Sequence, residues 1–311
     1  MPASGNRTAA AIPTPPGWEA RLELRFEAGP DGTRLVHNRH AGPLRLLKSL
    51  RSEDARRLEA VIVHPPGGLV GGDSLLLDLH VGSGARVLAT TPGAQKWYRA
   101  DKPASSSTRL EVATGATLEW LPQPAIVFDH AIARQSVALE LGPGACSIGW
   151  EVLVRGRSAM GETLESGHID QTLSISVAHA LLWQERLHAD ASDRLFLSPL
   201  GWDGQRAAAT IWCCAPALAS GDLLALRDRW RSLLGGEGTG PARPALPAVP
   251  AVLATPAAIA GGATIAAEGL LLAKLLGDDS EQLVSHCQAL WRAARMSLEG
   301  SAGSLPRIWR T

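Results

Sequence analysis

The chain has 311 residues, of which 30 are basic (Lys and Arg) and 30 are acidic (Asp and Glu), so its formal net charge is zero. This balance argues against a nucleic-acid binder, a polybasic membrane anchor and an acidic disordered tail, each of which carries an excess of one sign. Hydrophobic residues make up 45% and charged residues 19%, which indicates a globular protein.

Residues 1–17 are expected to form a flexible N-terminal extension. They lack the charged segment followed by an apolar core that defines a secretory signal, and no uninterrupted apolar run of the chain is long enough for a membrane span. The four cysteines are too few for a disulfide scaffold, and no pair has the C-x-x-C spacing of redox and zinc motifs. We therefore expect a cytoplasmic protein.

Alternating apolar and polar residues dominate the first two-thirds of the chain. In the segment from Arg21 to Glu27 every second residue is apolar, which predicts a half-buried strand. Similar strand-like runs occur at 60–63, 75–81, 85–89, 108–113, 117–121, 125–128, 136–141, 146–154, 172–177 and 180–187. Their regular spacing, with Gly-rich turns between many of them, is typical of a β-sandwich, barrel or solenoid and disfavours a doubly wound α/β fold.

Helical patterns appear only toward the C-terminus. The segment Gly221 to Leu234 has apolar residues at helical spacing, and the Pro-, Gly- and Ala-rich residues 235–250 predict a loop. A second helical block is predicted over 268–298, broken near Gly277. Asp279 is a candidate N-cap there, and one face carries Leu283, Cys287, Leu290, Trp291 and Ala294.

The most distinctive motif is the Gly-rich segment HPPGGLVGGD at 64–73. Its glycine spacing is close to that of a phosphate-binding loop, but Asp73 stands where such a loop needs Lys, and a strand-like run follows instead of a helix. We therefore reject nucleotide binding at this segment. The alternative is a tight connection between strands, in which Asp73 caps its own turn through backbone N–H groups.

Motifs of known hydrolases are missing, since neither G-x-S-x-G nor H-E-x-x-H occurs. The nine histidines are scattered along the chain, at positions 37, 40, 64, 80, 130, 168, 179, 188 and 286. Tight metal sites need three or four convergent donors, and no spacing in the sequence predicts one. The residues alone thus indicate a β-rich protein without a recognisable catalytic constellation.

Three segments in this order carry a family resemblance. The segments HPPGGLVGGD (64–73), TTPGAQKWYR (90–99) and LEWLPQPAIVFDHA (118–131) closely resemble the urease accessory proteins of the UreD family, also called UreH. Later features of the same family resemble WEVLVRGRSAMGE (150–162), WQERL (183–187) and LPRIWRT (305–311). The resemblance covers 18–311 and predicts a single UreD-like domain.

The resemblance implies a scaffold protein and no enzymatic activity. UreD-like proteins form a complex with UreF and the GTPase UreG, contact apo-urease and help deliver nickel to its active site. The family fold is mainly β, with two-layer sheets wound in a β-helix-like arrangement and a few helices toward the C-terminus. Nickel in transit would use an internal, water-filled passage, with no tightly bound cofactor, and the assembly would be dimeric through UreF.

A passage of this kind must bind Ni²⁺ weakly at several places, because tight capture would stop the transfer. The candidate donors within the family-like segments are Asp73, Glu151, His64 and Asp129, with Glu119, His130 and Glu162 as further oxygen and nitrogen donors. Asp73 and Glu151 are the first choices. Glu151 could instead pair with Arg155 or Arg157.

Partner contacts are predicted at Trp291 and Trp309, because Trp is enriched at interface hot spots. Intramolecular packing is the alternative for Trp291. Lys96, Tyr98 and Arg99 would form either a partner-facing patch or an internal polar network. Two other classes of protein stay open: an enzyme on a β-scaffold, and a structural oligomerisation protein without a metal role.

Overall fold

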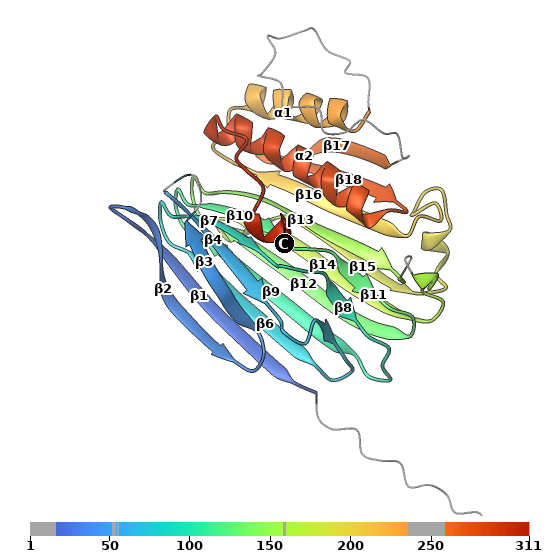
Figure 1. Ribbon diagram of the computed structural model, residues 1–311. Coiled ribbons are helices and arrows are strands. Elements are labelled where there is room, and N and C mark those ends of the chain that lie inside the picture. Colours follow the sequence, from blue (N-terminus) through green and yellow to red (C-terminus); the bar gives the residue numbers. More distant parts are fainter. Residues whose placement is uncertain (1–16, 52–53, 55, 158–159, 236–258, 311) are drawn as a thin grey trace, which may run out of the picture.

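The computed structural model describes residues 17–51, 54, 56–157, 160–235 and 259–310. The predicted N-terminal extension, except Gly17, and the predicted loop at 235–250, except Gly235, lie outside the described residues. Within them the fold consists of two β-sheets and two α-helices (Figure 1). None of the described helices combines the length and the apolar character that crossing a bilayer requires.

Sheet A has the strand order β15-β14-β12-β9-β6-β1-β2. Its strands are β1 (Glu19–Gly29), β2 (Gly32–Ala41), β6 (Ser74–Val81), β9 (Ala104–Val112), β12 (Ala131–Leu141), β14 (Gly167–Val177) and β15 (Ala180–Asp190).

Sheet B has the strand order β17-β18-β16-β13-β10-β7-β4-β3, with three short strands attached beside β13. The main strands are β3 (Arg45–Arg51), β4 (Arg57–Val63), β7 (Arg86–Thr90), β10 (Thr117–Leu121), β13 (Cys146–Arg155), β16 (Ala207–Cys214), β17 (Ala260–Ala267) and β18 (Leu270–Gly277). The short strands are β5 (Gly68–Leu69), β8 (Gln95–Trp97) and β11 (Ala125–Val127).

The chain winds between the two sheets. From β6 to β14 the main strands alternate between sheet A and sheet B, and neighbours along this path pair in parallel within each sheet. The turns that lead from sheet A into sheet B contain Gly84, Gly115 and Gly144, with φ of 68°, 65° and 65°. Glycine adopts this left-handed conformation without steric cost, so each winding can close tightly. The predicted β-helix-like arrangement is confirmed.

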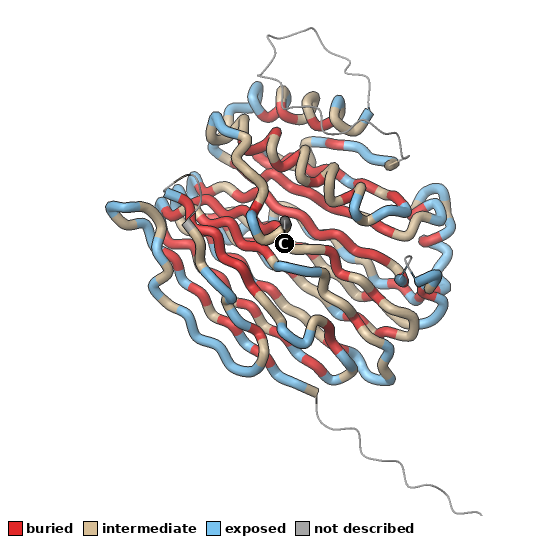
Figure 2. The backbone as a smooth tube through the Cα atoms, in the orientation of Figure 1, coloured by how far each residue is buried: buried red, intermediate tan, exposed pale blue. Residues whose placement is uncertain are grey.

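Two hydrophobic cores hold these layers together (Figure 2). The first lies between the sheets, where the inward side chains include Leu22, Leu110 and Leu139. The second lies between the opposite face of sheet B and the helices, and contains Trp150, Trp230 and Trp291. Sheet B is therefore covered on both faces, which fits its long runs of buried residues.

The helices α1 (Ser220–Leu233) and α2 (Ser280–Glu299) lie on the outer side of sheet B (Figure 1). Asp279 caps α2 as predicted, accepting the N–H groups of Glu281 and Gln282. The predicted helical block over 268–298 is wrong at its start, where β18 pairs with β16 on one side and β17 on the other. Its run LLLAKLL is apolar except for Lys274, and such a run suits a buried strand as well as a buried helix.

Short 3₁₀ helices include Arg194–Phe196 after β15 and Arg307–Arg310 near the C-terminus. The C-terminal one returns to sheet B, where the indole Nε1 of Trp309 donates a hydrogen bond of 3.0 Å to Thr90 Oγ1. The Trp309 ring lies 5.9 Å from that of Trp150, measured between centroids. The last turn thus packs on the body of the protein.

Candidate functional site: an internal polar path

The three distinctive sequence motifs meet at one place in the fold. Each contributes one short strand, and β5, β8 and β11 pair side by side in parallel before β11 joins β13. Gly68 is needed in this contact, because a Cβ atom there would lie 2.3 Å from Cε2 of Tyr98. Segments far apart in the sequence therefore depend on one another for packing.

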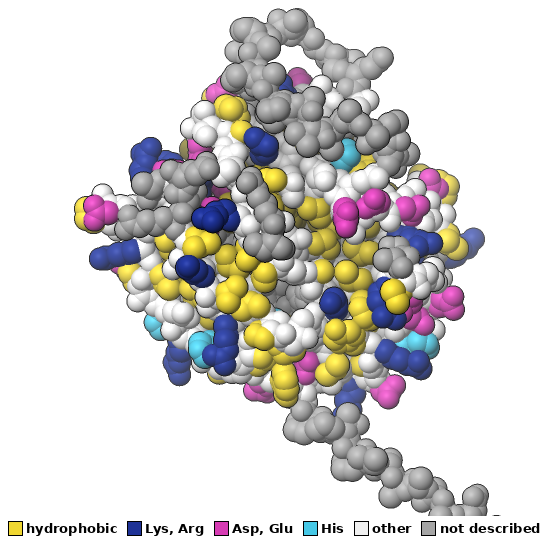
Figure 3. All heavy atoms as spheres, in the orientation of Figure 1, with side chains coloured by type: hydrophobic (Ala, Val, Ile, Leu, Met, Phe, Trp, Pro, Cys, Tyr) yellow, Lys and Arg dark blue, Asp and Glu magenta, His cyan; other side chains and the backbone are white. Residues whose placement is uncertain are grey.

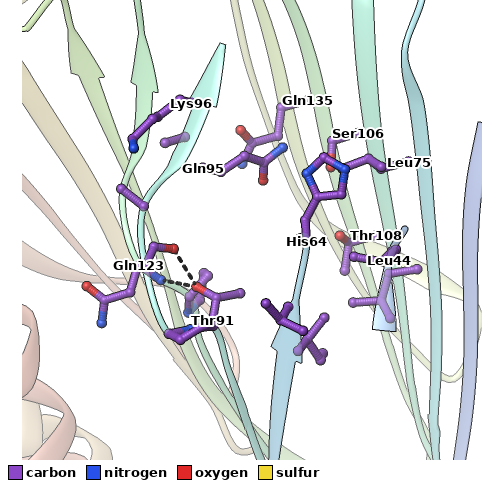
Figure 4. Close-up of a pocket in the computed structure, with 18 of the residues that line it drawn as sticks. Leu44, His64, Leu75, Thr91, Gln95, Lys96, Ser106, Thr108, Gln123 and Gln135 are labelled. Atoms are coloured by element: carbon purple, nitrogen blue, oxygen red, sulfur yellow. Dashed lines mark hydrogen bonds between the residues drawn. The ribbon is translucent and has the colours of Figure 1, made fainter. Parts of the chain in front are cut away.

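A cavity of about 300 Å³ lies between the two sheets beside these short strands, and we call it the first chamber. Its polar lining comes from both layers, with Gln135 of sheet A and Glu151 of sheet B among the contributors. Figure 4 shows Gln95 beside Gln135, and Thr91 in contact with Gln123. The lining also includes the exposed residues Pro92 and Gly93, so the chamber reaches the protein surface.

His64 stands at the end of β4 and lines the first chamber, with its ring near Ser106 and Leu75 (Figure 4). Burial lowers the pKa of His64, and the negative charge of Asp73 opposes this shift. The ring atom Nδ1 is buried and has no hydrogen-bond partner within the described part of the chain. A neutral imidazole with a free nitrogen is the form that binds a transition-metal ion.

Glu151 is the buried carboxylate of the first chamber. It lies at an inward position of β13, where Trp120 Nε1 donates a 2.8 Å hydrogen bond to Oε1 and Gln135 Nε2 donates one to Oε2. Burial raises the pKa of Glu151 to about 7, although both hydrogen bonds favour the charged form. A carboxyl group with this pKa can exchange its proton for a cation near neutral pH.

The sequence-based alternative for Glu151, an ion pair with Arg155 or Arg157, does not match the contacts in the structure. Arg155 places its guanidinium 3.7 Å from the ring centroid of Phe196. Arg157 pairs with Glu162 at the surface. Glu151 is therefore left with neutral hydrogen-bond donors.

A second chamber, of about 310 Å³, begins on the other side of Glu151. Glu151 lines both chambers and so stands in their shared wall. Strand register places Thr210 opposite Glu151 and Lys274 opposite Thr210. Lys274 donates a 2.7 Å hydrogen bond to Thr210 Oγ1 and forms an ion pair with Glu185. We call the row that continues from the first chamber through Glu151 to this group the internal polar path.

Asp73 and Asp129 lie outside the described lining of both chambers. Asp73 is buried and caps its own turn, since its carboxylate accepts the N–H groups of Val70 at 2.9 Å and Trp18 at 2.8 Å. This is the alternative that the Gly-rich motif left open. Asp129 holds the next loop by accepting the N–H groups of Glu165 and Ser166, both at 2.9 Å.

The candidate partner residues do not form one surface. Trp291 is fully buried, and its Nε1 donates a 2.9 Å hydrogen bond to Glu119 in the core. Lys96 lines the first chamber, and Tyr98 packs edge-on against Phe128 with 5.1 Å between ring centroids. Arg99 is exposed. In the described structure Trp291 therefore has an internal packing role, and Arg99 remains the most accessible of these side chains.

The sequence analysis did not predict several residues of the internal polar path, including Gln135, Gln171, Glu185, Thr210 and Lys274. A signal for Gln135 does exist, because it falls in phase with the apolar residues Ala133 and Val137 of the same strand. A polar residue at a core position of a strand marks a hydrated or functional interior.

The fold and the path define a β-rich scaffold with a polar interior that reaches the surface. A family model described as "UreD urease accessory protein" matches residues 19–310. The chain belongs to the UreD family of urease accessory proteins, as the resemblance of the three motifs predicted.

Individual relatives extend along nearly the entire chain. The urease accessory protein UreD of Pseudomonas fluorescens is 39% identical over 307 residues, which cover 98% of this chain and 100% of the relative. The protein of the same name from Pseudomonas aeruginosa is 38% identical over 298 residues, covering 95% and 96%. That of Dechloromonas aromatica is 36% identical over 297 residues, with the same coverage.

Proposed function

We propose that this chain is a non-catalytic scaffold of urease maturation that passes Ni²⁺ along its internal polar path toward apo-urease. The observation that carries the proposal is the position of Glu151 in the wall shared by two chambers, each lined by residues that are exposed at the surface. Membership in a family of urease accessory proteins supplies the biological context.

The donors along the path suit transit better than storage. His64 offers one nitrogen and Glu151 one carboxylate. The rest of the polar lining consists of neutral groups, including the side-chain amides of Gln135 and Gln123 and the hydroxyl of Thr91. Tight sites for Ni²⁺ or Zn²⁺ gather three or four strong donors in one coordination shell. A sequence of weaker sites lets the ion enter and leave, with Ni²⁺ as the cargo and no tightly bound cofactor.

Protonation of Glu151 gives the path a simple means of release. When Ni²⁺ binds, the Glu151 carboxyl group loses its proton. When the ion leaves, the buried carboxylate takes up a proton again, because burial disfavours its charged form. Glu185 in the second chamber is already paired with Lys274, so its carboxylate is less available to a cation. An ion would therefore be held most strongly at Glu151 and less strongly beyond it.

We further propose that the chain acts in a complex with UreF and the GTPase UreG, which docks on apo-urease, and that UreF makes this complex dimeric. The zero net charge supplies no bulk attraction, so docking would depend on apolar and shape-matched surfaces. Figure 3 supports this, because hydrophobic side chains gather across the middle of one face with Lys and Arg among them.

Complex formation is tested by co-purification. We expect the tagged full-length chain to retain both a UreF-like and a UreG-like protein and to elute with them as one discrete species in size-exclusion chromatography. An unrelated tagged β-protein is the control for adsorption to the resin. Elution of the folded chain free of both partners would contradict the proposed complex.

A further inference from the structure

The outer face of sheet A carries a group of imidazoles and carboxylates that the internal path does not use. The sequence His-x-Asp occurs on β14 as His168 and Asp170, and again on β15 as His188 and Asp190. The antiparallel register sets His168 opposite Asp190 and Asp170 opposite His188. The buried residue between each pair shows that all four side chains point outward.

The geometry brings the donor atoms of this group close together. One ligand atom from each of His168, Asp170 and His188 lies within 4.8 Å of the others. The two imidazole rings are 4.5 Å apart between centroids, and His168 Nδ1 lies 2.8 Å from Asp190 Oδ1. Metal–ligand bonds of about 2.1 Å place ligands of one ion at most about 4.2 Å apart, so small rotations of these partly exposed side chains suffice.

We propose that His168, Asp170 and His188 form a surface site for a divalent transition cation of the Ni²⁺ and Zn²⁺ class. Two imidazole nitrogens and one carboxylate oxygen bind cations of this class better than they bind Mg²⁺ or Ca²⁺, which prefer oxygen ligands alone. Asp190 fixes His168 through Nδ1, which leaves Nε2 as the ligand, in the manner of carboxylate–histidine–metal arrangements. Water would complete the coordination.

Two cations near the site set its affinity. Arg186 of β15 donates to both oxygens of Asp170, at 3.2 Å and 3.1 Å, and lies 3.4 Å from His188 Nδ1. Arg134 of β12 is in register with Asp170 from the other side. An entering metal ion must displace Arg186 from Asp170, so binding is weak and reversible. Removal of Arg186 should therefore strengthen metal binding.

Isothermal titration of the purified full-length chain with NiCl₂ tests the site. Apart from any weak uptake by the internal path, which all variants share, we expect one saturable equivalent that the double variant His168→Ala/His188→Ala loses. Arg186→Ala should bind that equivalent about fivefold more tightly. His80→Ala is the matched control, because His80 faces a single carboxylate, Glu111, on the same side of the same sheet. Its titration should equal that of the wild type.

Unchanged stoichiometry and affinity in the double variant would overturn the site, as would the absence of saturable binding by the wild type. Circular dichroism of each variant shows whether the fold is retained, which these outward positions favour. If Arg186→Ala gains affinity, the ion occupies the position that the guanidinium left. Urease activation does not enter this measurement, so a negative result leaves the proposed maturation function intact.

Discussion

Replacing Glu151 by Gln is expected to raise the free energy of unfolding, and this gain should be about 2.5 kcal/mol larger at pH 8 than at pH 5. Burial raises the pKa of Glu151 from 4.5 to about 7, so the folded state binds the proton more tightly than the unfolded state. Between these two pKa values stability falls as the pH rises, and above about pH 7 the full cost of the buried charge is present. Gln removes this cost.

Urea unfolding at both pH values measures the effect. The local contacts can be kept, because the oxygen of the introduced amide still accepts from Trp120, and the unpartnered Oε1 of Gln135 can turn to accept the new N–H group. Glu111→Gln is the control, since the Glu111 side chain is 67% exposed. If the free energy of unfolding changes by the same amount between pH 5 and pH 8 in wild type and Glu151→Gln, then Glu151 is not the buried titrating group described above.

Arg57→Ala is expected to lower the free energy of unfolding by about 3–5 kcal/mol. Arg57 and Glu119 are both fully buried and form an ion pair of 3.0 Å, and Glu299 of α2 binds the same guanidinium. Arg295 of α2 contacts Glu119 at 3.3 Å. Without Arg57, Arg295 is the one described guanidinium that still contacts the buried Glu119, whereas Glu299 also keeps Arg86 at 3.7 Å.

Thermal and urea unfolding of Arg57→Ala can be compared with Arg56→Ala. The Arg56 side chain is 75% exposed, so its removal should change stability by no more than about 0.5 kcal/mol. Burial raises the pKa of Glu119 to about 7, and Arg57 is the group that most opposes this shift. The destabilisation by Arg57→Ala should therefore be larger at pH 8 than at pH 5. Equal stability of the two variants would show that the cluster does not hold α2.

The fold class followed from local patterns, because half-buried strands and glycine turns are encoded within short stretches of sequence. The pairing order was not accessible in this way. The run from Leu270 to Gly277 is a strand because β16 and β17 flank it, and the pairing with β16 joins segments that are distant in the sequence. Local periodicity cannot report a neighbour of that kind.

The site was predictable to a smaller extent. Glu151 and His64 were selected through the family-like segments, and both line the first chamber. Asp73 carries a carboxylate like that of Glu151, yet two backbone N–H groups donate to its oxygens, and only the folded turn shows this. The proximity of His168 and His188 depends on the register of two strands, so neither His-x-Asp motif could reveal it when taken alone.

The nickel content of urease assembled with the Glu151→Gln chain tests the proposed route most directly. Apo-urease would be incubated with Ni²⁺, UreF- and UreG-like partners, and wild-type, Glu151→Gln or Glu111→Gln chain, then separated and analysed by atomic emission. The predicted result is equal loading with wild type and Glu111→Gln and several-fold lower loading with Glu151→Gln. Full loading by Glu151→Gln would contradict a nickel route through the internal polar path.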